Sequence, residues 1–285
     1  MVDEVAVVGA GTMGVGIAYV FAAAGYAVAL VEPDEARFAG ALHTLGDAAA
    51  AGVKRGKLEP ERGRALVASV ARYAHAADLP MGVGIAIETV PERAELKARV
   101  LREIAARRPE LIATNTSSLS VDSLAASVER PENFLGMHFF NPVWSLPLVE
   151  LVRGAATSAA TLARARVLAE SVGKTTIVVE DTPGFATSRL DLIAALEAIR
   201  MLQDGVASAE DIDKAMVVAY RHPVGPLRLS DIVGLDVRLD IARQLARALG
   251  PRYEPPKLLE DMVGRGELGR KTGKGFFDWP RDAAL

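Results

Sequence analysis

The chain has 285 residues and a formal net charge of −3, and 50% of its residues are hydrophobic and 24% charged, so it can bury a large core. This charge gives no basis for binding nucleic acid or an anionic membrane, and the absence of cysteine excludes disulfides, thiolate catalysis and Cys-ligated metals. A strand is expected almost from the first residue, and no apolar run could span a bilayer. We therefore expect no signal peptide, no membrane association, no metal site and a cytoplasmic location.

Residues 4–14, EVAVVGAGTMG, are typical of a dinucleotide-binding turn. A short apolar strand, Val5 to Val8, leads into glycines with GxGxxG spacing. Gly9 would make the tight turn, Gly11 would let the backbone approach a diphosphate, and Gly14 would let helix and strand pack closely. We expect the helix that follows to end at Gly25 and to hold the diphosphate at its N-terminus. The predicted cofactor contacts here are Gly9, Ala10, Gly11, Thr12, Met13 and Gly14.

A second predicted strand, residues 27–31, ends in Glu32, at the distance from the glycines that dinucleotide binding requires. A carboxylate at that position can accept a hydrogen bond from the ribose 2′-hydroxyl of NAD and would repel a 2′-phosphate. Glu32 therefore favours NAD over NADP. The alternative is a βαβ unit that binds no nucleotide, with Glu32 as an ordinary exposed carboxylate.

Residues 34–68 are expected to form a pair of helices, the first capped by Asp34. A basic turn, residues 53–58, separates them and contains Lys54, Arg55 and Lys57. These side chains are either a solvated helix end or a landing site for a polyanionic substrate tail such as the phosphates of CoA.

The predicted sheet resumes at residues 70–73 and 83–87, and the latter strand ends at Glu88. Pro91 and Glu92 are expected to open a helix that runs through Ile104. A further strand, residues 111–114, is followed by the polar segment 115–118. Because ligands bind at the carboxyl ends of strands in open parallel sheets, this segment is a candidate site.

The next predicted strand begins at Phe134. His138 and Asn141 lie at its end. The apolar run 148–152 is interrupted by Glu150, whose burial would be costly without a partner. We therefore predict that His138 pairs with Glu150. The other histidines, His43, His75 and His222, are interpreted as ordinary core or turn residues.

A helix over 159–171 and a strand over 175–179 complete the first predicted domain, residues 1–181. Beyond the DTPG segment at 181–184 only helices are expected, so residues 182–285 form a second domain. The helices expected in this second domain are one over 185–205, a second capped by Ser208, and a third that runs from 226 through Leu245. The predicted fold class is α/β: a Rossmann-type, mostly parallel sheet followed by an all-helical C-terminal domain.

Together these motifs resemble the L-3-hydroxyacyl-CoA dehydrogenases, most closely the stand-alone 3-hydroxybutyryl-CoA dehydrogenases. The matching segments are GAGTMG at 9–14, NTSSL at 115–119, MHFFNP at 137–142, LVELV at 148–152, DTPGF at 181–185 and GRKTGKGFFDW at 269–279. The resemblance implies reversible, NAD-dependent oxidation of a short-chain L-3-hydroxyacyl-CoA to the 3-ketoacyl-CoA, in metabolism of the fatty-acid or butanoate type. It also implies a substrate cleft wall formed by the C-terminal domain and a homodimer through that domain.

The expected chemistry assigns His138 as general base, because imidazole exchanges protons near neutral pH. Glu150 would orient the ring, Ser117 would bind the substrate oxygen and contact the cofactor, and Asn141 would position the nicotinamide and His138. By resemblance, Glu92, Lys97 and Lys271 contact the cofactor, and Lys54 contacts CoA.

One position departs from the resemblance. Where the family has an asparagine that contacts the substrate, this chain has Ser188, which is shorter and would need a water molecule to span the same gap. Ser188 keeps open a dehydrogenase of a free hydroxy or sugar acid, such as gulonate, on the same scaffold. A dinucleotide-binding protein without catalysis is the third hypothesis, and the complete catalytic set argues against it.

Overall fold

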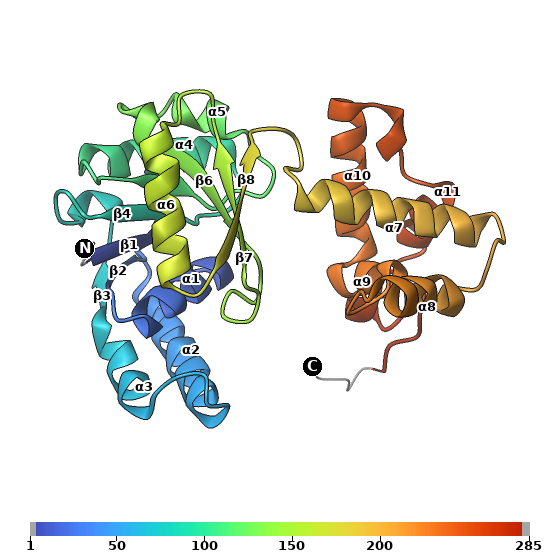
Figure 1. Cartoon of the computed structure of the whole chain (residues 1–285), viewed down its shortest axis with the longest axis horizontal. Coiled ribbons are helices and arrows are strands. Elements are labelled where there is room, and N and C mark those ends of the chain that lie inside the picture. The colour runs from blue at the N-terminus through green and yellow to red at the C-terminus, as the bar shows by residue number, and fades with distance from the viewer. Residues whose placement is uncertain (1–3, 281–285) are drawn as a thin grey trace. The chain divides into compact units, whose positions relative to one another are not determined.

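The computed structural model describes residues 4–280, which divide after Thr182 into two compact units. Unit 1 contains every strand of the sheet, and unit 2 is built from helices (Figure 1). Among the described residues, every helix is too short or too polar to cross a bilayer.

Unit 1 is organised around an eight-stranded sheet with the order β3-β2-β1-β4-β5-β6-β7-β8. Strands β1 to β6 run parallel, β7 is antiparallel to β6, and β8 is parallel to β7. The strands are β1 (Glu4–Val8), β2 (Ala27–Val31), β3 (Val70–Tyr73), β4 (Ile85–Glu88), β5 (Ile112–Thr114), β6 (Phe134–Phe139), β7 (Leu148–Arg153) and β8 (Thr175–Glu180). The expected mostly parallel, Rossmann-type sheet is confirmed.

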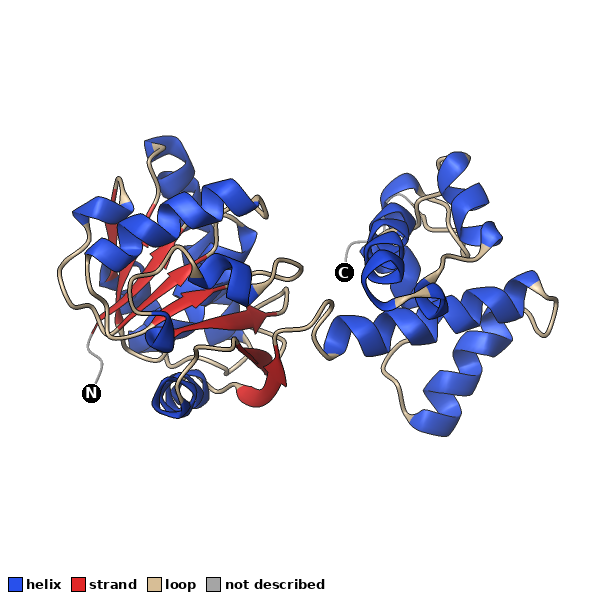
Figure 2. Cartoon of the chain, turned by 90° about the horizontal axis from the view of Figure 1, so that it is seen from above, coloured by secondary structure: helices blue, strands red, loops and turns tan. Residues whose placement is uncertain are grey.

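Helices lie on both sides of this sheet (Figure 2), which explains why its central strands are continuous apolar runs rather than alternating ones. They are α1 (Thr12–Ala23), α2 (Glu35–Lys54), α3 (Pro60–Leu66), α4 (Ala94–Ala106), α5 (Val121–Ala125) and α6 (Ala159–Ser171). Side chains of α1, α2 and α6 share one hydrophobic core with the sheet. The carboxyl ends of β1 to β6 are thereby held at one edge.

Asp34 caps α2 as predicted, because its side chain accepts a hydrogen bond from the backbone nitrogen of Arg37 at 3.0 Å. The prediction that Pro91 and Glu92 open a helix is wrong. Helix α4 begins only at Ala94, after an extended Arg93. The carboxylate of Glu92 instead accepts hydrogen bonds from residues 116–118, and this tertiary contact outweighs its local preference for a first helical turn.

Unit 2 contains α7 (Thr187–Gln203), α8 (Ala209–Tyr220), α9 (Pro226–Val233), α10 (Leu235–Leu249) and α11 (Lys257–Gly264). Ser208 caps α8 as expected. The single helix expected from 226 through Leu245 is two helices, because Gly234 adopts φ +106°, outside the helical region, and separates α9 from α10. Short 3₁₀ turns cover Val67–Ser69, Ala76–Asp78, Pro131–Asn133, Pro251–Tyr253 and Arg270–Thr272.

Candidate active site

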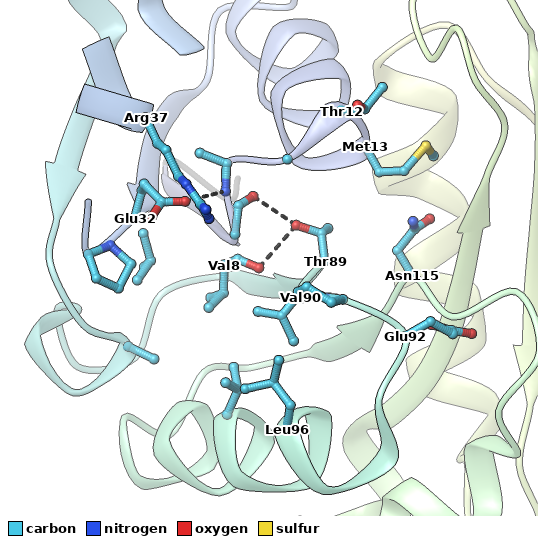
Figure 3. A pocket seen from close by; sticks show the side chains of 18 of the residues that line it. Val8, Thr12, Met13, Glu32, Arg37, Thr89, Val90, Glu92, Leu96 and Asn115 are labelled. Atoms are coloured by element: carbon cyan, nitrogen blue, oxygen red, sulfur yellow. Dashed lines mark hydrogen bonds between the residues drawn. The ribbon is translucent and has the colours of Figure 1, made fainter. Parts of the chain in front are cut away.

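A cavity of about 1190 Å³ lies in unit 1 at the carboxyl ends of the parallel strands. Connections from β1 and β4 lead to opposite halves of the sheet, so this is the switch point at which open α/β sheets bind ligands. The cavity brings together most of the predicted site residues: Gly9, Ala10, Gly11, Thr12, Met13, Glu32, Glu92, Ser117, His138 and Asn141. Figure 3 shows Glu32 on one side of it and Glu92 on the other.

The glycine turn has the geometry that its spacing predicts. Gly9 adopts φ +110°, and a Cβ on Gly14 would lie 1.8 Å from the carbonyl oxygen of Gly9, so only glycine fits there. A Cβ on Gly11 would meet no protein atom within 4 Å, and Gly11 caps α1 without a side-chain hydrogen bond. The start of α1 therefore borders open space in the cavity, and a helix N-terminus there favours an anion such as a diphosphate.

Glu32 lies where β2 ends and is only 8% exposed. One carboxylate oxygen accepts from the backbone nitrogen of Asp34 at 3.1 Å, and the other lies 3.4 Å from that of Ala10 (Figure 3). These contacts fix the carboxylate beside the glycine turn. Arg37, in the first turn of α2, also lines this part of the cavity.

His138 and Glu150 form the predicted pair. They are register partners on the antiparallel strands β6 and β7, and His138 Nδ1 lies 2.7 Å from Glu150 Oε2. Glu150 is fully buried and His138 is 7% exposed, so the imidazole supplies the partner that a carboxylate in an apolar strand needs. His138 also lines the cavity, and the pair therefore presents an oriented imidazole to it.

Ser117 lies in a loop after β5, residues 116–118, that is tied to Glu92 (the Ser117 loop). Glu92 Oε1 accepts from Thr116 Oγ1 at 2.5 Å and from the backbone nitrogens of Ser117 and Ser118, each at 3.0 Å. Burial alone would raise the pKa of Glu92, but these hydrogen bonds and the charge of Lys97 outweigh it and lower the pKa below its ordinary value of 4.5. Glu92 is thus held as a carboxylate.

Lys97 lies behind Glu92 and is not among the residues that line the cavity. Its side chain is 1% exposed, and its Nζ lies 2.9 Å from Glu88 Oε1 and 3.3 Å from Glu92 Oε2. The structure therefore places it as a support for Glu92, while its expected contact with the cofactor stays a prediction.

Two asparagines border the cavity near His138. Asn141, the predicted one, follows β6 and precedes a cis peptide bond to Pro142. The buried Lys174 donates to the carbonyl oxygens of Val143 and Leu146 and so anchors the loop after Asn141. Asn115 accepts from the backbone nitrogen of Phe139 at 2.9 Å and ties the ends of β5 and β6 together.

Besides Gly14, Lys97 and Glu150, whose places are described above, three more predicted residues do not line this cavity. Lys54 is exposed at the C-terminal end of α2 in unit 1. Ser188 lies in the first turn of α7 in unit 2, and Lys271, also in unit 2, is paired with Asp236. Their expected contacts with substrate or cofactor stay predictions.

The sequence reasoning gave no site role to Arg37, His75 and Thr89, which line the cavity, and it included Asn115 only as part of the candidate segment 115–118. Thr89 Oγ1 donates to the carbonyl oxygens of Val8 and Gly9 and so joins β4 to the glycine turn (Figure 3). Thr89 directly follows β4, and this position at a strand's carboxyl end, the signal that singled out residues 115–118, could have identified it as well. Among residues 4–280, no group of three or more His, Asp or Glu side chains could hold a metal ion.

The fold and this site define a class: a Rossmann-type, dinucleotide-binding dehydrogenase whose cavity contains an imidazole–carboxylate pair. The model of the 3-hydroxyacyl-CoA dehydrogenase NAD binding domain matches residues 4–182, and that of the 3-hydroxyacyl-CoA dehydrogenase C-terminal domain matches residues 184–279. The chain belongs to the 3-hydroxyacyl-CoA dehydrogenase family.

Full-length relatives agree with this assignment. The chain is 40% identical to 3-hydroxybutyryl-CoA dehydrogenase of Bradyrhizobium diazoefficiens, covering 98% of this chain and 96% of the relative. It is 40% identical to 3-hydroxybutyryl-CoA dehydrogenase of Mycobacterium tuberculosis, covering 98% and 99%. Its structure resembles that of (S)-3-hydroxybutyryl-CoA dehydrogenase from Ralstonia eutropha with a TM-score of 0.93 and 37% identity, covering 98% and 100% of the two chains.

Proposed function

We propose that this protein catalyses the reversible, NAD-dependent oxidation of a short-chain L-3-hydroxyacyl-CoA, of the 3-hydroxybutyryl-CoA type, to the 3-ketoacyl-CoA. The observation that carries the proposal is the hydrogen bond between the fully buried Glu150 and His138, which lines the same cavity as the glycine turn. The names of the full-length relatives support the four-carbon acyl group.

NAD, when bound, would supply the acceptor for the hydride that leaves the substrate carbon bearing the hydroxyl group. The hydroxyl proton must leave at the same time, and His138 takes it. Because Nδ1 of His138 donates to Glu150, the tautomer makes Nε2 the accepting atom, and Glu150 stabilises the imidazolium that results. The hydroxyl of Ser117 donates to the substrate oxygen, where negative charge develops, and Asn141, which lines the cavity with His138, would hold the nicotinamide.

The remaining roles belong to the same proposal. Residues 1–181 bind NAD, with Glu32 on the ribose hydroxyls and Glu92 and Lys271 as further cofactor contacts, and Lys54 binds a CoA phosphate. Residues 182–285 supply Ser188 toward the substrate, a wall of the substrate cleft, and the homodimer interface. The protein is cytoplasmic.

The test is the oxidation of NADH by acetoacetyl-CoA, followed by absorbance, with NADPH and with free acetoacetate in parallel. Rapid loss of NADH with the CoA ester alone is the expected result. Activity with NADPH would contradict the role of Glu32, and activity with free acids but not CoA esters would favour the hydroxy- or sugar-acid dehydrogenase.

Lys54→Ala tests the CoA contact. It should raise KM for acetoacetyl-CoA by about tenfold and leave kcat nearly unchanged, because a charge on a remote part of the substrate contributes mainly to uniform binding. The matched control is Lys57→Ala, an exposed lysine in the same basic turn. Equal effects of the two variants would indicate general electrostatic attraction rather than a specific contact.

A further inference from the structure

Glu88 is a buried charged residue for which the proposed mechanism has no use. It is the last residue of β4 and has no exposed surface, and its partner Lys97 is 1% exposed. Removing two charges from water is costly, and a pair at this depth needs further hydrogen bonds to offset the cost. The pair does not line the cavity, but Lys97 contacts Glu92, which does, so the pair can hold a cavity residue in place.

Glu88 is held by hydrogen bonds from three residues, and one of these, Lys97, also contacts the cavity residue Glu92. Its carboxylate accepts from Thr114 Oγ1 at 2.6 Å and from the backbone nitrogen of Val90 at 2.7 Å. Lys97 Nζ donates to both carboxylate oxygens, at 2.9 and 3.1 Å. Glu88 is thus fixed by the loop that follows β4, by β5 and by α4.

Lys97 links Glu88 to a second carboxylate, that of Glu92. Its Nζ also lies 3.3 Å from Oε2 of Glu92, whose other oxygen, Oε1, accepts from residues 116, 117 and 118. The chain of contacts therefore runs from Glu88 through Lys97 and Glu92 to the Ser117 loop. The side chain of Glu92 is 34% exposed, so Lys97 is its anchor on the buried side.

We propose that Glu88 is a positioning residue, which holds Lys97 against Glu92 and thereby fixes the Ser117 loop at the edge of the cavity. Without Glu88, Lys97 would have Glu92 as its single carboxylate partner. The ammonium group would then move together with the Glu92 side chain and would no longer hold that side chain in place. Ser117 must meet the substrate oxygen within hydrogen-bond distance, so a small displacement of the loop impairs the reaction. Burial raises the pKa of Glu88 in spite of the opposing charge of Lys97, as expected for a carboxylate placed there for position rather than for stability.

The test uses Glu88→Gln, which keeps the shape and removes the charge, in the full-length protein. Its first readout needs no turnover: amide exchange at Ser117 and Ser118, whose nitrogens donate to Glu92, should become about tenfold faster. The control is Thr161→Val, which removes a buried hydroxyl on α6 that donates to the carbonyl oxygen of Glu132. This control should lower stability without changing exchange at Ser117 and Ser118.

The second readout is kinetic and rests on the proposed function. With acetoacetyl-CoA, Glu88→Gln should lower kcat by about tenfold, while Kd for NADH changes less than about threefold. Because Glu88 acts through Glu92, the double variant with Glu92→Gln should have about the kcat of Glu92→Gln alone. Additive losses, or unchanged amide exchange in Glu88→Gln, would overturn the proposal.

A wild-type protein without activity on any acyl-CoA would refute the proposed function, and the amide exchange would still decide the role of Glu88. Where Glu88→Gln does not fold, Thr114→Val replaces it, since this change removes one hydrogen bond to Glu88 and no charge. It should accelerate exchange at Ser117 and Ser118 by about threefold, and exchange equal to the wild type would then overturn the proposal.

Discussion

At the scale of single residues, the site depends on one hydrogen bond. His138 Nδ1 and Glu150 Oε2 lie 2.7 Å apart, and the carboxylate is fully buried. A buried carboxylate opposite an imidazole fixes the orientation of the ring and its tautomer together. This arrangement is the reason we propose that His138, one histidine of four, accepts a proton from the substrate.

His138→Gln tests this role. We expect kcat to fall by at least about a hundredfold, because general-base catalysis typically contributes that much, while Kd for NADH stays unchanged. Stopped-flow turnover and NADH fluorescence titration measure the two quantities. His43→Gln is the control, since His43 is exposed on α2 and is paired with Asp47. A variant at 138 with wild-type turnover would refute the assignment.

Glu92 makes the stability of the protein depend on pH. Its folded-state pKa lies below the ordinary value of 4.5, so its contribution to the free energy of unfolding is present above about pH 4.5 and is lost as the pH falls through the lower, folded-state pKa. We expect the stability advantage of wild type over Glu92→Gln to be constant near neutral pH and to shrink in acid. Urea unfolding between pH 6 and pH 3 measures it, and an advantage that grew in acid would contradict this sign.

At the scale of elements, the pairing of β6 with β7 decides where the carboxylate lies. The antiparallel register places Glu150 opposite His138, on the same face of the sheet. A slip of one residue would move Glu150 to the other face, since side chains alternate along a strand. The apolar side chains of Val149 and Leu151, both fully buried, oppose such a slip.

The turn between β1 and α1 allows two glycines to be distinguished experimentally. Gly14→Ala would place a Cβ 1.8 Å from the Gly9 carbonyl oxygen, and we expect it to cost about 1–3 kcal/mol of unfolding free energy. Gly11→Ala meets no protein atom and should keep its stability, but its methyl group would occupy the space of the diphosphate and raise Kd for NADH by about tenfold or more. Thermal unfolding and NADH titration separate the two effects. Unaltered NADH binding by Gly11→Ala would place the diphosphate elsewhere.

At the scale of the whole molecule, the proposed homodimer through residues 182–285 gives a direct prediction. Unit 2 exposes large apolar side chains, among them Leu190 at 69%, Val218 at 63% and Tyr220 at 71%. Light scattering should give a mass of twice 30.2 kDa for wild type and a monomer for Val218→Asp/Tyr220→Asp. The control is Val167→Asp, which changes a valine that is 64% exposed in unit 1. Loss of the dimer in this control as well would argue against an interface in unit 2.

The sequence by itself determined the features that depend on neighbours along the chain. The apolar runs predicted the strands, the glycine spacing predicted the turn at Gly9, and Asp34 and Ser208 predicted caps that the structure contains. The pairing of His138 with Glu150 was also predictable, because a single carboxylate in an apolar run must find a partner.

Only the tertiary structure decided the contacts between distant segments. Nothing local predicts that Glu92 turns away from α4 to hold residues 116–118, or that Glu88 and Lys97 lie behind it. The sequence also did not predict the end of α9 at Gly234, because the apolar pattern continues from α9 into α10. A buried charge takes its position from whichever polar groups the packed strands bring within reach, and that selection exists only once the sheet has formed.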